Sequence, residues 1–178
     1  MTKSQTKAIL KKYCSKNDEL PYFWHPMKID GHLFASNSFS SIYITNIDAD
    51  SFGYKEPDEI IHKKVVSYIS DLEFVFTNKI KIDISKWQKA ETFGKRNFFD
   101  QKCIQINNQY IDLEHYNWLL EVCEIKKVKE ITLIQHGRVN DELGVFSPKP
   151  FVFRFEEITV SIMPLKHRWS ILTGTIKI

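Results

Sequence analysis

The chain has 178 residues, of which 43% are hydrophobic and 26% are charged, and its formal net charge at pH 7 is +3. This composition is ordinary for a globular domain and excludes the disordered, fibrous and membrane-spanning classes. A strongly basic nucleic-acid binder would have a pI above about 9, so the small positive charge permits DNA binding without requiring it.

The N-terminal sequence and the cysteines both favour a protein that stays inside the cell. Met1–Lys7 is positively charged, but the apolar segment of a secretory signal does not follow it, and no run approaches the roughly 18 apolar residues of a membrane span. The cysteines Cys14, Cys103 and Cys123 are odd in number and far apart in the sequence. We therefore expect a cytoplasmic protein without a membrane partner.

Residues 1–92 predict an N-terminal α+β half. Apolar residues at helical spacing, among them Ile9, Leu10 and Tyr13, indicate a first helix over about residues 3–16. Further along this half, the patterns predict two or three strands over 21–46 with a turn at Asp30-Gly31, a helix starting at 57–59, a strand or hairpin over 73–84, and a short helix over 85–90.

Residues 102–178 predict a C-terminal half, and residues 93–101 are interpreted as the linker between the halves. This half begins with a strand at Ile104–Ile106, and Asp112 is well placed to cap a helix that reaches Cys123. Strands are then expected over 130–134, 151–155 and 158–165, with Phe151, Phe153 and Phe155 alternating on one face of the second. A polar loop over 137–149, a turn at Glu156-Glu157 and a last strand over 170–178 are also expected. The expected fold class is α+β, with antiparallel sheets that carry helices on one face.

The order strand, helix, three strands resembles the half-domain unit of sliding DNA clamps. Val160–Lys166, with the sequence VSIMPLK, is similar to the closing strand of the bacterial clamp, the beta subunit of the replicative polymerase, which typically ends in Met-Pro-Met-Arg. Asp30–Phe39 resembles the family segment in which a strand runs into Ala-Thr-Asp-Gly-His, although Asn37-Ser38-Phe39 replaces the last three residues. The resemblance covers residues 3–46 and 80–166 and implies DNA-clamp-like half-domain units.

The resemblance implies two binding surfaces. In clamps the helices line an inner face and touch DNA phosphates without reading bases. The lysines that fit this face are Lys3, Lys7, Lys11, Lys12 and Lys16. The second helix fits it less well, because it carries three acids and has basic residues only at its end: Glu114, Glu121, Glu124, then Lys126 and Lys127. The family also has an apolar pocket for peptide tails of polymerases, which by position would be formed here by Ile162, Met163, Pro164 and Leu165.

These features predict a non-enzymatic, clamp-like factor of DNA replication. It would contact duplex DNA non-specifically or capture an apolar peptide of a replication protein, and no catalytic residue, metal ligand or cofactor is predicted. A standard bacterial clamp protomer carries three such domains, so encircling DNA would require a homo-oligomer of this chain or another partner.

Two other functional interpretations remain open. His25, Asp30 and His32 are close enough in sequence to converge on adjacent strands, which would suit a small metal-dependent hydrolase or nuclease, although HExxH and CxxC spacings are absent. A purely structural oligomeric module is favoured if the aromatic strand expected at Pro21–Trp24 forms an exposed patch. The proposed surfaces also have structural explanations, since a charged stripe is typical of any surface helix and Met163-Pro164 suits a strand end.

Overall fold

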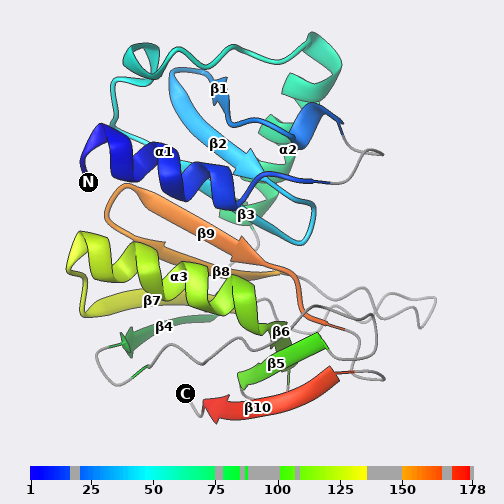
Figure 1. The fold of residues 1–178 in the computed structure, drawn as a ribbon, viewed down its shortest axis with the longest axis vertical. Helices are drawn as coiled ribbons and strands as arrows, with labels where there is room; N and C mark the ends of the chain where they lie inside the picture. The colour runs from blue at the N-terminus through cyan, green and yellow to red at the C-terminus, as the bar shows by residue number, and fades with distance from the viewer. Residues whose placement is uncertain are drawn as a thin grey trace.

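The computed structural model describes residues 1–16, 21–74, 78–84, 87, 101–106, 109–135, 150–165 and 170–176 (Figure 1). Within these residues the chain forms three α-helices, a seven-stranded antiparallel sheet and a three-stranded sheet. The predicted α+β class is therefore confirmed. Helices α1 and α3 lie side by side in front of the large sheet in Figure 1, and α2 lies behind it.

Helix α1 (Lys3–Lys12) opens a unit that continues into three short antiparallel strands. A capping box starts the helix: Thr2 Oγ1 accepts from the Gln5 N–H at 3.2 Å, and Gln5 Oε1 accepts from the Thr2 N–H at 2.9 Å. The strands are β1 (Met27–Ile29), β2 (His32–Ser36) and β3 (Ser40–Ile44). Asp30 and Gly31 have φ angles of 49° and 79°, which suit the predicted tight turn between β1 and β2.

Helix α3 (Leu113–Lys126) opens a second unit with the same order of elements. The predicted N-cap is confirmed, because Asp112 Oδ1 accepts from the N–H groups of Glu114 at 2.7 Å and His115 at 3.3 Å. The predicted strands follow as β7 (Glu130–Gln135), β8 (Phe151–Phe155) and β9 (Ile158–Ile162). Each unit therefore consists of one helix and the three strands after it.

The remaining elements connect or flank these two units. They are η1 (Pro21–Phe23) and η2 (Ala49–Phe52), both 3-10 helices, then α2 (Glu59–Phe74), β4 (Asn78–Asp83), β5 (Gln101–Ile106), β6 (Gln109–Asp112) and β10 (Ser170–Ile176). The strand order of the large sheet is β1-β2-β3-β9-β8-β7-β4, and that of the small sheet is β10-β5-β6. The two units thus share one sheet and meet at the β3–β9 pair.

The β3–β9 pair relates the two units by an approximate two-fold rotation. Residues 40–44 pair antiparallel with residues 162–158, centred on Ile42 and Val160. The ladder continues at both ends, since the Met163 N–H donates to the Phe39 carbonyl at 2.7 Å and the Thr45 N–H donates to the Glu157 carbonyl at 2.9 Å. The hairpin turn of each unit is therefore bonded to the residue that follows the last strand of the other unit.

The main core lies between this sheet and helices α1 and α3. Leu10 of α1 and Leu119 of α3 are completely buried against sheet residues that include Ile42, Phe153 and Val160. The predicted inward stripe of the first helix is confirmed, and Phe151, Phe153 and Phe155 share this face as expected. Hydrophobic burial on this side joins residues of both units into one core.

The expectation that all helices lie on one face of the sheet is wrong, because α2 covers the opposite face. Residues next to each other in β2 point to opposite faces: Leu33 joins the α1–α3 core, whereas Phe34 packs with Ile61 and Val65 of α2. Hydroxyl groups hold α2 at the centre of the sheet, where Tyr68 hydrogen-bonds to Ser161 and Ser161 Oγ lies 2.8 Å from Ser41 Oγ. Both faces of the sheet are therefore buried.

Three other expectations about the fold need correction. The sheets were expected to be antiparallel, but the strand before α3 belongs to a separate small sheet in which β5 pairs parallel with β10. Pro21–Phe23 is a 3-10 helix and not a strand. Over 73–84, Glu73 and Phe74 end α2, and β4 is a single strand that pairs with β7.

Several predicted segments fall wholly or mostly outside the described residues. Among them are residues 93–100 of the expected linker, the loop over 137–149, and all but Trp87 of the short helix expected over 85–90. Gln101, the last residue of that linker, begins β5.

Candidate functional site

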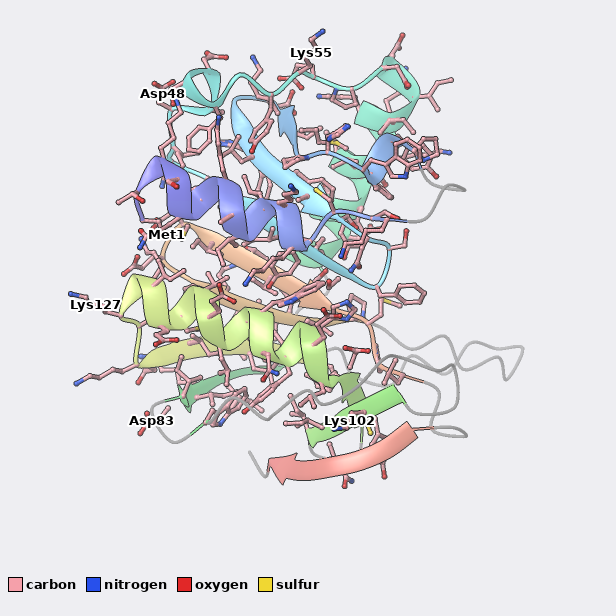
Figure 2. All side chains as sticks on the ribbon, in the orientation of Figure 1. Met1, Asp48, Lys55, Asp83, Lys102 and Lys127 are labelled. Atoms are coloured by element: carbon pink, nitrogen blue, oxygen red, sulfur yellow. The ribbon has the colours of Figure 1, made fainter. Side chains whose placement is uncertain are left out.

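The five lysines proposed to contact DNA are all on α1 or just after it. Lys3, Lys7, Lys11 and Lys16 are exposed, and Lys12 is half-exposed. Helix α1 runs antiparallel to α3, so Met1, before α1, and Lys127, after α3, lie at the same end of the helix pair (Figure 2). The surface of the helix pair that faces away from the sheet therefore forms one side of the molecule.

Aromatic residues at the end of η2 and just after it contact the first two lysines. The Lys3 ammonium lies 5.6 Å from the centroid of the Phe52 ring, and the Lys7 ammonium lies 5.9 Å from that of Tyr54. The two rings stack with centroids 6.2 Å apart, and Lys3 Nζ also donates to the Ser51 carbonyl. These contacts orient two cations without neutralising them, since the rings carry no net charge. No sequence pattern predicted this arrangement, because the aromatic residues are distant from the lysines in the chain.

An ion pair neutralises one acid of α3, whereas the lysine near the end of α3 pairs with acids outside the helix. Lys12 of α1 pairs with Glu121 of α3 across the helix interface. At the end of α3, Lys126 pairs with Glu156 at 2.8 Å and Glu157 at 2.6 Å, and its side chain is only 13% exposed. Lys126 therefore anchors the β8–β9 turn and is not a surface cation, while the repulsion of a phosphate by Glu121 is weakened.

Acid is expected to weaken the anchor at Lys126. The hydrogen bonds that Lys126 donates to Glu156 and Glu157 raise the pKa of Lys126. Burial opposes ionisation of Glu157, but its bonds with Lys126 lower the pKa of Glu157 overall. A carboxyl group whose pKa is lowered by folding stabilises the fold, and this stabilisation is lost as pH falls through the folded-state pKa. An ammonium group whose pKa is raised by folding also stabilises the fold, but this stabilisation is lost as pH rises through the folded-state pKa. The ion pairs of Lys126 therefore stabilise the fold fully at pH values between 4.5 and 10.5, the usual pKa values of the glutamate and lysine side chains.

Lys126→Met should remove this contribution, about 1–2 kcal/mol at pH 7, and should flatten the fall in unfolding free energy between pH 7 and pH 3. Urea titrations across this range measure the effect, with Lys127→Met as the matched control because Lys127 is exposed. If Lys126→Met loses stability with acid as steeply as the wild type, the pairing does not contribute.

The apolar segment proposed to bind a partner divides into a buried and a half-exposed part. Ile162 is completely buried in the main core, so it has no surface to offer a partner. Met163, Pro164 and Leu165, here called the closing segment, are half-buried. Their backbone is held at both ends: the Met163 N–H donates to the Phe39 carbonyl, and the Leu165 N–H donates to the Tyr110 carbonyl at 2.7 Å.

Phe39 and Tyr110 extend the apolar surface of the closing segment. Phe39 is 62% exposed at the tip of the β2–β3 turn, and Tyr110 is half-buried in β6. Neither residue was predicted from the sequence to belong to this surface. A large apolar residue inside the polar turn Asn37-Ser38-Phe39 was the available signal, since such turns are usually occupied by small polar residues.

The structure does not bring together the residues of the metal-site hypothesis. Asp30 pairs with His62 of α2 at 2.9 Å, whereas His32 packs edge-on against Tyr43 and His25 is exposed. Among the described residues, no group of three or more His, Cys, Asp or Glu side chains is arranged to hold a metal ion.

The three cysteines are packing residues of the core. All three are buried, and burial raises the pKa of Cys14 and Cys123 to about 12. These two thiols therefore stay protonated at neutral pH and are poor nucleophiles.

Comparison of the chain with protein-family models, with curated proteins and with solved structures finds no match. In the part of the chain that the structure describes, no helix is both long enough and apolar enough to cross a membrane.

Proposed function

We propose that the chain is a non-enzymatic, clamp-like domain that associates with duplex DNA through the outer surface of α1. The observation that carries the proposal is the β3–β9 junction, about which two units of one helix and three strands are related by a two-fold rotation. This arrangement places two antiparallel helices on one face of a continuous sheet (Figure 1). It is the arrangement expected of a clamp-like domain built from two half-domain units.

The charges on the helix pair favour α1 as the DNA-contacting element. Lys7 and Lys11 are one helical turn apart and exposed, and Lys3 continues the same row. Lysines in a row contact successive phosphates without reading bases, so the binding would be independent of sequence and sensitive to salt. Helix α3 would contribute less, because Lys126 is held by Glu156 and Glu157.

Fluorescence anisotropy with a labelled duplex of mixed sequence tests this proposal. We expect binding at low salt that weakens steadily as salt increases and that is equal for duplexes of unrelated sequence. A chain that is folded but does not bind duplex at low salt would overturn the DNA part of the proposal.

A second function, capture of an apolar peptide, is favoured by the surface that joins Phe39, the closing segment and Tyr110. Exposed aromatic and aliphatic side chains on a backbone fixed by hydrogen bonds are typical of the anchor positions in peptide-binding sites. Because the hydrogen bonds of Met163 and Leu165 hold this backbone in place, binding would require little reordering.

Selection of peptides from a displayed random library tests the second function. A selected peptide should bind the Phe39→Ser and Leu165→Ser variants at least about tenfold more weakly than the wild type. Ile60→Ser is the matched control, because Ile60 is 68% exposed at the start of α2, away from this surface. Equal loss in the control, or no selected peptide, would exclude this site.

A further inference from the structure

A hydrogen bond between two side chains connects the β2–β3 turn to the first turn of α3. Asn37 Nδ2 lies 3.1 Å from His115 Nε2. The His115 side chain is buried, and its ring packs against Trp118 with centroids 4.9 Å apart. This contact joins the two units of the fold beside the closing segment, because the same turn carries Phe39, whose carbonyl accepts from Met163.

The direction of this hydrogen bond follows from the other contacts of Asn37. Its Oδ1 accepts from the N–H of Phe39 at 3.0 Å and from the N–H of Ser40 at 2.8 Å. A rotated amide would place an NH2 group against these two donors, so the observed orientation is fixed and Nδ2 must donate to His115. His115 Nε2 is therefore the acceptor, and the ring is neutral with its proton on Nδ1.

We propose that Asn37 and neutral His115 form a positioning pair that holds the turn, and thereby Phe39, against the closing segment, and that protonation of His115 releases it. This inference rests on the proposed peptide site, whose regulation it describes. A proton on Nε2 would place two donors face to face, so the hydrogen bond that connects the turn to α3 would be lost. Partner capture would then be strong at neutral pH and weak in acid.

The charges near His115 decide how readily it is protonated. In its own helix, the N-cap Asp112 and the first-turn Glu114 favour a positive ring, whereas burial and the helix N-terminus oppose it. From α1, Tyr13 packs against Trp118, and burial raises the pKa of its hydroxyl well above 10, so Tyr13 stays neutral. The turn itself contributes only Asn37, Ser38 and Phe39, which do not titrate in this range. Release is therefore expected in acid, where the ring would take up a second proton.

Amide hydrogen exchange measures the release without any peptide. In the wild type, protection of the Met163 amide, corrected for the intrinsic pH dependence, should fall about tenfold between pH 7.5 and pH 5.5. The internal control is the Thr45 amide, which donates to the Glu157 carbonyl at the symmetry-related end of the same ladder. Its protection should not change by this factor.

Two variants separate titration of His115 from general loosening of the fold. His115→Gln keeps an acceptor for Asn37 but cannot be protonated, so the Met163 amide should stay protected at pH 5.5. Asn37→Asp replaces the donor by an acceptor, so protection should increase in acid, because a protonated ring can then donate to the carboxylate. Acid sensitivity that persists in His115→Gln, or that is absent from the wild type, would overturn the positioning pair.

The exchange result and the peptide result are independent of each other. Acid-sensitive exchange at Met163 without any peptide binding supports the positioning pair and rejects the peptide site. Peptide binding whose affinity and exchange pattern do not change between pH 7.5 and pH 5.5 rejects the positioning pair and retains the site.

Discussion

Phe153→Ala is expected to lower the free energy of unfolding by about 3–5 kcal/mol, the largest effect of any single change considered. Phe153 is completely buried in β8, pairs across the sheet with Leu133 and Val160, and stacks beside Phe151 with ring centroids 6.2 Å apart. Removing the ring opens a cavity in the core that joins both units, and a rigid sheet cannot collapse to fill it. Urea denaturation followed by tryptophan fluorescence and by circular dichroism measures the loss.

The same experiment tests whether the two units fold together. Because β3 and β9 form one ladder and share a core, both probes should report a single coincident transition in the wild type and in Phe153→Ala. Ile60→Ala is the control: its side chain is 68% exposed, and the change should stay within about 0.5 kcal/mol. Two separate transitions, with only one shifted by Phe153→Ala, would contradict a shared core.

Asp112→Ala is expected to cost about 1–2 kcal/mol, which is at the upper end for helix caps. Asp112 is 2% exposed and accepts from two N–H groups in the first turn of α3, so its loss leaves buried donors without their acceptor. Thermal and urea unfolding should both register the change. Asp112→Ser should recover most of the stability because a hydroxyl also caps, whereas equal losses in both variants would mean that the carboxylate acts through something other than the cap.

Local patterns predicted the elements that depend on local physics. Leu10 and Leu119 lie on apolar stripes with helical spacing, and Asp112 is a cap that can be recognised from its neighbours alone. The alternation of Phe151, Phe153 and Phe155 likewise predicted that these residues share one face of β8, which is the face that packs against α1 and α3. These features follow from the periodicity of one segment, and the structure agrees with them.

Features that depend on distant segments were predicted poorly. The parallel pairing of β10 with β5 joins residues far apart in the chain, so no local pattern distinguishes it from an antiparallel hairpin. The position of α2 did have a signal, because Leu33 and Phe34 are consecutive apolar residues, which indicates a strand buried on both faces. The engagement of Lys12 by Glu121 depends on the packing of two helices and could not be read from either alone.

The salt dependence of duplex binding tests whether the lysines of α1 contact DNA phosphates. The logarithm of the binding constant should fall linearly with the logarithm of salt concentration, and replacing Lys7 and Lys11 by Gln should reduce the slope by about 1.8, because each phosphate contact contributes about 0.9. The control is the Lys63→Gln, Lys64→Gln double variant, which removes the same charge from exposed positions on α2, on the other side of the sheet.

If α1 contacts the DNA, the salt slope should be reduced in the α1 variant and unchanged in the α2 variant. Equal slopes for the wild type and the α1 variant, or equal reductions in both variants, would contradict the assignment of α1 as the DNA-contacting face.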